Sequence, residues 1–321
     1  MAPTSGATPH QTLSELHGRN ILNLKVGVVY PQIELKGDPQ ALRDFARSVE
    51  AMGFNHLVMY DHVVGAVGEH RDPPLTGPYR ETDPFHDPLI AYAHLAALTS
   101  TLEFCPGVMI LPQRQTVLVA RQAADLDLLS GGRFSLGIGV GWNPVEYEAL
   151  GIDFKSRGER LTEQIELLRR LWSGEVVDFQ GKHHRVDRAA LVPAPANSIP
   201  IICGGLSAPA YRRAAKHADG FIFTGPFDEV AVPGLRKLHQ LLEENERGKE
   251  GFRADLDVVG RPAARHGDFE GLSVPDLLET LETWETTGGT HAAVKTMGMG
   301  YTTVDEHLEH LVKVADALGL R

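Results

Sequence analysis

Short apolar runs alternate with amphipathic stretches along most of this chain. From Leu24 onward, eight runs rich in β-branched, aromatic and other apolar residues have the composition of buried strands: 24–30, 55–60, 102–110, 133–140, 199–204, 220–224, 255–260 and 292–297. Between them, apolar residues recur at helical spacing, and each such stretch ends in glycine or small polar residues. A last amphipathic stretch, 304–319, follows the eighth run. The pattern predicts eight strand–helix repeats.

Eight repeats within 321 residues favour one α/β domain, a (β/α)8 TIM barrel, over an open doubly wound sheet. We therefore expect a single barrel domain over residues 21–321. Residues 1–20 begin with a stretch rich in Ala, Pro, Ser, Thr and Gly that has no apolar core, so we expect a flexible tail there rather than a secretory signal.

Two long loop-like stretches interrupt the repeats. Residues 61–88 are dense in Pro and Gly and follow the second predicted strand. Residues 173–197 predict a hairpin, with its turn at Gln180 and Gly181, followed by a Pro-rich connector. The first of these insertions follows a strand and therefore lies at the C-terminal face of a barrel. Long structureless connections are uncommon, so we expect a covered site there, with 63–82 as its lid.

Composition narrows the choice of partner. The net charge of -11, with no basic block, argues against nucleic acid, because binding phosphates needs clustered Lys and Arg. No run approaches the length of a membrane span. Cys105 and Cys203 lie far apart in apolar segments, which indicates buried thiols in a reducing cytoplasm rather than a disulfide. These observations argue against nucleic acid and a membrane as partners.

The fourth predicted strand is threaded with Gly137, Gly139 and Gly141 and ends at Trp142. Glycines in a buried strand indicate that something approaches the backbone closely. At the C-terminal end of a parallel strand, where α/β proteins carry their chemistry, we expect a ligand against Gly139, Gly141 and Trp142. Close packing of a helix on the strand stays open as the alternative.

Polar candidates follow other strands. His62 ends the second strand beside Asp61, and an imidazole can donate or accept a proton at neutral pH. A histidine satisfied within its loop is the alternative. Glu146 is a second candidate, with a solvated or capping carboxylate as the alternative. His183 and His184 are adjacent in a predicted strand and point to opposite faces, so we expect no metal site.

After the fifth strand, Gly204 and Gly205 lead through Leu206 to Ser207, an expected helix N-cap, with Pro209 in the first turn. A helix N-terminus with free backbone N–H groups and small side chains suits an anion such as a phosphate. An ordinary capped strand–helix turn is equally compatible with these residues.

Three segments carry a family resemblance, in this order: GVMILPQRQTVLVARQAA (107–124), DLDLLSGGRFSLGIGVGWNPVEYEALGIDFKSRGERLTEQIELLRRLW (125–172) and IPIICGGLSAPAYRRAAKHADGFIF (199–223). They resemble the bacterial luciferase-like monooxygenase superfamily of flavin and deazaflavin oxidoreductases. Within it, the chain is most similar to the actinobacterial branch that depends on the deazaflavin coenzyme F420. The resemblance extends from about Leu24 to the C-terminus.

The resemblance implies a barrel with the cofactor ring over its mouth and the cofactor phosphate near Gly204, Gly205, Leu206 and Ser207. It also implies a non-proline cis peptide at Gly107-Val108 behind the ring. His62 matches a histidine that relatives place near the ring, so it is the expected catalytic residue, and Asp61 is included among the expected cofactor contacts.

The implied function is hydride transfer between reduced F420 and an unidentified small organic substrate. An FMN-dependent monooxygenase that uses O2 is one alternative, and a barrel that binds the cofactor without catalysis is another. Sugar-phosphate dehydrogenases of the family carry a catalytic glutamate just after the glycines of the fourth strand, where this chain has Trp142 or Asn143. A sugar phosphate is therefore not the expected substrate.

Two predicted helices have more apolar residues than one buried face can hold. One of them contains Val117, Val119, Ala120, Ala123, Ala124 and Leu126, and the other contains Leu89, Ile90, Tyr92, Leu95 and Leu98. Monomers rarely expose large apolar patches, and dimers are usual in the family that the chain resembles, so we expect a homodimer. Folding of the 62–82 loop over the surplus is the alternative.

Overall fold

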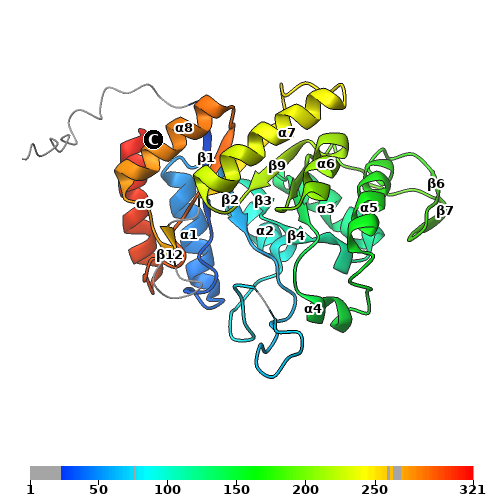
Figure 1. Ribbon diagram of the computed structural model, residues 1–321, viewed down its shortest axis with the longest axis horizontal. Coiled ribbons are helices and arrows are strands. Elements are labelled where there is room, and N and C mark those ends of the chain that lie inside the picture. The colour runs from blue at the N-terminus through cyan, green and yellow to red at the C-terminus, as the bar shows by residue number, and fades with distance from the viewer. Residues whose placement is uncertain (1–22, 76, 259–260, 263–268, 321) are drawn as a thin grey trace, which may run out of the picture.

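Parallel strands form the wall of a barrel surrounded by helices (Figure 1). The structure is a computed structural model that describes residues 23–75, 77–258, 261–262 and 269–320. The predicted tail, 1–20, lies outside the described residues. The strands of the wall are β1 (Lys25–Val29), β2 (His56–Met59), β3 (Glu103–Pro106), β4 (Met109–Ile110), β5 (Leu136–Gly139), β8 (Ile201–Gly204), β9 (Gly220–Phe223), β10 (Arg253–Val258) and β13 (His291–Lys295).

The order of the strands shows that the barrel closes. It runs β3-β2-β1-β13-β10-β9-β8-β5-β4, and the strand pairs within it are parallel. Only Gly107 and Val108 separate β3 from β4, so the two ends of the order belong to one segment of chain. The nine pieces therefore fill eight positions, and the predicted (β/α)8 TIM barrel is confirmed.

The predicted helices form the outer layer (Figure 1). They are α1 (Pro39–Ala51), α2 (Pro88–Ala96), α3 (Thr116–Ser130), α5 (Arg157–Leu171), α6 (Ala208–His217), α7 (Val232–Glu244), α8 (Val274–Thr287) and α9 (Val304–Leu318). Sequence signals explain several starts: Asp38 and Asp87 cap α1 and α2, each followed by a proline, and Thr303 forms a capping box with Glu306 at α9. In the described part of the chain, no helix is both long and apolar enough to cross a bilayer.

Some elements differ from the sequence prediction. The sequence predicted no helix directly after Trp142, but a short one, α4 (Pro144–Ala149), lies there, and the Asn143 side chain caps it by accepting a hydrogen bond from Val145 N at 3.0 Å. Short turns η2 (Leu111–Gln113) and η3 (Phe227–Ala231) precede α3 and α7. The predicted hairpin is present as β6 (Val177–Gln180) and β7 (Arg185–Ala189), and a second pairs β11 (Arg261–Pro262) with β12 (Phe269–Glu270).

The barrel interior is charged on one side and apolar on the other. In the sheet order, β1 and β13 separate β2 from β10, so contacts between β2 and β10 cross the interior. His56 Nε2 lies 3.6 Å from Asp255 Oδ2, and the Tyr60 hydroxyl just past β2 donates to Asp257 Oδ2 at 2.7 Å. On the other side, Cys105 packs against Ile202 and Ile222. Both cysteines are buried thiols, as predicted.

A buried ion pair joins the end of β2 to the segment after the β3–β4 break. Asp61 Oδ2 accepts a hydrogen bond from Ile110 N at 2.9 Å, and Asp61 Oδ1 accepts one from Arg114 Nη2 at 2.8 Å. Arg114 Nη1 also donates to Asp87, the cap of α2, at 2.9 Å. Burial raises the pKa of Asp61 although Arg114 and the amide of Ile110 act against it. One carboxylate thus fixes β2, β4 and α2 relative to one another.

We expect Asp61→Asn to lower the free energy of unfolding by about 2 kcal/mol, because an amide N–H₂ group cannot accept from Arg114 and a buried charged hydrogen bond is lost. Urea unfolding followed by circular dichroism measures this. Asp125→Asn is the matched control, since it removes the exposed Asp125–Arg121 pair, which contributes about 0.5 kcal/mol or less. Equal midpoints for the two variants would show that the Asp61 pair does not stabilise the barrel.

Candidate active site

The break between β3 and β4 points a side chain at the glycines of the neighbouring strands. The Gly107-Val108 peptide is cis, as the family resemblance implied. A Cβ atom added at Gly139 would lie 2.5 Å from Val108 Cγ2, and one added at Gly204 would lie 2.8 Å from Val108 Cγ1. Val108 therefore occupies the space that side chains at these glycines would need. Gly139 has no side chain because Val108 fills that space, and not because a helix packs there. Its contact with a ligand stays a prediction.

The end of β5 turns sharply into the segment that carries Trp142. Gly141 has a φ of +65°, a left-handed conformation that favours glycine, and its nearest neighbour is Ile110. The Trp142 ring lies against Gly77 of the long loop that follows β2, so a side chain at Gly77 would collide with the indole. The predicted lid thus reaches across to the end of β5.

His62 stands among aromatic rings at the mouth. Its imidazole centroid lies 4.9 Å from that of Phe85, 5.1 Å from Tyr79 and 5.6 Å from Trp142, each approaching edge to face. Two of these rings belong to the loop after β2, and Trp142 follows β5. The His62 side chain keeps 10% of its surface exposed. The predicted proton-transfer residue is therefore enclosed by the lid but still reachable.

The partner of His62 is Glu146, from the first turn of α4. His62 Nδ1 lies 3.0 Å from Glu146 Oε2, and Glu146 Oε1 accepts hydrogen bonds from Val63 N at 2.8 Å and Val64 N at 3.4 Å. Only 1% of the Glu146 side chain is exposed. It is thus neither solvated nor a cap of its own helix, which were the alternatives open from the sequence, and it joins α4 to the start of the lid.

The charge of Glu146 follows from these contacts. Burial alone would raise the pKa of the carboxyl group, but the hydrogen bond and charge of His62 and the amides of Val63 and Val64 more than offset it, and the pKa is lowered. The carboxylate is therefore ionised at neutral pH.

The other predicted strand-end residue, Asp61, faces the protein. Each of its carboxylate oxygens accepts a hydrogen bond, one from Ile110 and one from Arg114. Asp61 therefore holds the backbone directly before His62 in place. A contact between Asp61 and a cofactor stays a prediction.

The turn after β8 has the features of a phosphate cradle. Gly205 has a φ of +133°, Leu206 and Ser207 are exposed, and the Ser207 side chain makes no capping hydrogen bond although it is the N-cap of α6. Its hydroxyl and the start of the helix are therefore open to an anion. Since β8 pairs with β5 and β5 with β4, this turn and Val108 lie on one side of the barrel mouth.

The sequence interpretation missed a polar group on the other side of the mouth. Asp257 is buried and accepts a hydrogen bond from the Tyr60 hydroxyl, and among the described residues its Oδ1 has no hydrogen-bond partner. Lys295 Nζ lies 5.5 Å from the centroid of the Tyr60 ring. The sequence did contain a signal for it, because Asp255 and Asp257 alternate in a strand predicted to be buried, which is unusual unless they face a polar interior.

His183 and His184 make separate contacts. His184 binds Glu163 through Nδ1 at 2.7 Å and the Thr116 hydroxyl through Nε2 at 2.7 Å, whereas His183 Nε2 lies 3.4 Å from Glu159. Across the described residues, His, Cys, Asp and Glu side chains gather nowhere in a group of three or more able to hold a metal ion.

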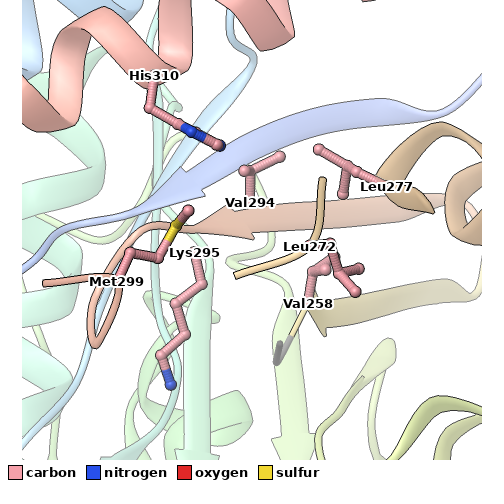
Figure 2. Close-up of a pocket in the computed structure, with 7 residues that line it drawn as sticks. All are labelled: Val258, Leu272, Leu277, Val294, Lys295, Met299 and His310. Carbon is pink, nitrogen blue, oxygen red and sulfur yellow. The ribbon is translucent and has the colours of Figure 1, made fainter. Parts of the chain in front are cut away.

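A small cavity lies away from His62, beside β10 and β13 (Figure 2). Its lining residues are Val258, Leu272, Leu277, Val294, Lys295, Met299 and His310, and its volume is about 10 Å³. That volume holds one water molecule at most. In Figure 2 the Lys295 amine extends away from the other side chains of the cavity. The cavity is too small for a substrate.

Comparison with known proteins agrees with this geometry. A profile described as luciferase-like monooxygenase matches residues 24–263. The chain belongs to this family. It is 30% identical over 268 residues to an F420-dependent glucose-6-phosphate dehydrogenase of Nakamurella multipartita, an alignment that covers 76% of each protein. The predicted enzyme class, a luciferase-like oxidoreductase, is confirmed.

Solved structures with low sequence identity share the fold. The F420-dependent tetrahydromethanopterin reductase of Methanopyrus kandleri superposes with a TM-score of 0.69 at 14% identity, covering 92% of this chain and 97% of the reductase. A riboflavin lyase with modified FMN and riboflavin gives a TM-score of 0.72 at 16% identity, covering 92% of each chain. At such identities the likeness establishes the barrel and not the chemistry.

Proposed function

We propose that this protein transfers a hydride between reduced coenzyme F420 and a small organic substrate at the barrel mouth. The observation that carries the proposal is His62, held by a buried carboxylate and surrounded by the rings of Tyr79, Phe85 and Trp142. When bound, the deazaflavin supplies the hydride chemistry at its C5 atom. The name of the 30% identical relative, an F420-dependent dehydrogenase, supports this choice of coenzyme.

The residues at the mouth fit a flat ring with a phosphate tail. Val108 projects from the cis peptide between Gly139 and Gly204, with no larger side chain from either neighbour above it, and would support the face of a ring. Gly205, Leu206 and Ser207, with their exposed helix start, would hold the phosphate. Trp142 and the lid would exclude water from the reacting atoms.

The substrate we propose is not a sugar phosphate, although the relative's name contains one. Trp142 and Asn143 follow the glycines of β5, where the sugar-phosphate enzymes place a glutamate, and the Asn143 side chain is already used to cap α4. His62 is left to exchange the proton that accompanies the hydride.

A second candidate is an FMN-dependent monooxygenase of the same family. The family model that matches residues 24–263 is described as a monooxygenase, which supports this candidate. Both candidates use the same cradle for the phosphate.

A charge at the phosphate cradle tests both candidates. Ser207→Asp keeps a good N-cap, because aspartate caps helices as well as serine does, but it adds like charge where the phosphate would sit. We expect the dissociation constant of the coenzyme to rise at least tenfold. Titrations of F420 and FMN, followed by absorbance and fluorescence, measure the change and show which coenzyme binds more tightly. Ser273→Asp, at the N-cap of α8, is the control. Unchanged affinity in Ser207→Asp would place the phosphate elsewhere.

Removing the imidazole tests the chemistry. His62→Ala leaves the cradle intact, so we expect coenzyme affinity within a few-fold of the parent and a kcat lowered by about 10²–10⁴, the usual effect of losing a general acid or base. Steady-state kinetics with an accepted substrate, combined with the coenzyme titration, separates the two effects. Turnover equal to that of the parent would remove His62 from the mechanism.

We also propose a homodimer formed through α2 and α3. Most of the apolar residues that appeared surplus in the sequence are buried, but two of them, Ile90 and Val117, are exposed, Ile90 by 70%. Leu118 and Leu129 of α3 are also exposed, Leu129 by 73%. The lid packs on Trp142, and these four side chains remain exposed with it in place. A second copy of this chain is the partner that a self-complementary apolar face would take.

Light scattering at micromolar concentration should give twice the 35.0 kDa mass of one chain. Ile90→Glu combined with Leu118→Glu should give a monomer, because two carboxylates would lie unpaired in the interface. Val176→Glu, at an exposed apolar position beside the β6–β7 hairpin, is the control and should stay dimeric. A mass near that of one chain for the parent protein contradicts the proposal.

A further inference from the structure

We propose that Glu146 is a positioning residue that keeps a proton on Nδ1 of His62, so that Nε2 is the atom that exchanges a proton with the substrate. This rests on the proposed function, in which His62 takes part in the reaction, and adds which atom acts and what determines it. Within the described part of the chain, the hydrogen bonds of the Glu146 side chain go to His62 and to the start of the lid.

The carboxylate has one orientation. Oε1 accepts from the amides of Val63 and Val64, and Oε2 faces His62 Nδ1 at 3.0 Å. The amides belong to the residues directly after His62, so the carboxylate, the ring and the backbone that carries the ring form one closed set of bonds. Turning the carboxyl group out of this plane would break its hydrogen bonds to both amides. Only 1% of the side chain is exposed to water that could replace them.

The direction of the His62 bond follows from the donors available. A carboxylate only accepts hydrogen bonds, and the lowered pKa of Glu146 keeps it in that form. Nδ1 must therefore donate, and neutral His62 carries its hydrogen there and a lone pair on Nε2. Among the described residues, the other recorded neighbours of the ring are Tyr79, Phe85 and Trp142, and burial raises the pKa of Tyr79, so it stays neutral.

The proton balance is simple. Neutral His62 takes a proton from the substrate at Nε2 and becomes imidazolium, whose charge the Glu146 carboxylate balances. In the reverse direction, imidazolium returns the same proton from Nε2 to the substrate. The hydrogen on Nδ1 stays on its bond to Glu146 throughout, so the ring needs no rotation between turnovers.

Glu146→Gln tests the assignment in the protein without coenzyme or substrate. The glutamine carbonyl oxygen can still accept from Val63, but its N–H₂ group then faces Nδ1 and donates, so the neutral ring must carry its hydrogen on Nε2. Long-range ¹H–¹⁵N NMR spectra distinguish the two tautomers. The His62→Gln variant identifies the His62 signals among the 15 histidines. We expect the Nδ1–H form in the parent and the Nε2–H form in Glu146→Gln.

Glu148→Gln is the matched control, because Glu148 is an exposed residue of the same short helix. It should leave the tautomer and the kinetics as in the parent. In Glu146→Gln we expect kcat to fall by about 10²-fold with KM within a few-fold, since the wrong nitrogen carries the hydrogen and the charge that balances imidazolium is lost. Coenzyme titration and the thermal midpoint establish that the variant is folded.

The outcomes separate this inference from the proposed function. An Nε2–H tautomer in the parent, or an Nδ1–H tautomer kept in Glu146→Gln, overturns the role of Glu146 whatever the enzyme's reaction. A switched tautomer with unchanged kcat overturns the assignment of proton exchange to Nε2. Failure of the proposed function shows instead as unchanged turnover in His62→Ala, and the tautomer of the free protein does not depend on it.

Discussion

The ion pair between Asp61 and Arg114 is the constraint on which the barrel mouth depends. A carboxylate with 1% of its side chain exposed needs partners for both oxygens, and it finds them in the amide of Ile110 and the guanidinium of Arg114. Ile110 belongs to the short strand after the cis peptide, and Arg114 also binds the cap of α2. The residue that follows Asp61 is His62. The same bonds that tie the end of β2 to β4 therefore determine where the imidazole leaves the backbone.

The sequence predicted the strands and the principal helices because parallel strands buried on both faces form continuous apolar runs, and because Asp-Pro and Ser-x-Pro caps mark helix starts. Strand-end residues such as His62 and Gly204 could be located for the same reason. Their partners could not. Glu146 is 84 positions from His62, and Asp257 is 197 positions from Tyr60, so each pair exists only once the barrel has closed. Helix α4 was missed because six residues are too short for a periodic pattern.

The two sides of the interior differ in chemistry for a reason visible in β10. Arg253, Asp255 and Asp257 all point inward, so this strand fills its side of the barrel with charges that meet His56 and Tyr60 across the interior. Opposite them, Cys105, Ile202, Ile222 and Val108 leave the side beneath the phosphate cradle apolar. A ring that rests on Val108 would therefore lie over hydrocarbon, with the polar groups gathered at the far side of the mouth.

The two cysteine thiols lie on opposite sides of the barrel wall. Cys105 lies inside the barrel with Ile202 and Ile222, whereas Cys203, the neighbour of Ile202 in β8, points outward into the large core cluster that also contains Ala210 and Ala214 of α6. Burial raises the pKa of each thiol to about 12, so neither reacts while it stays buried. Alkylation of Cys203 requires only that the outer layer loosen, and alkylation of Cys105 requires that the wall itself part. The alkylation rate of Cys203 therefore reports on opening of the helical layer, and that of Cys105 on opening of the barrel wall.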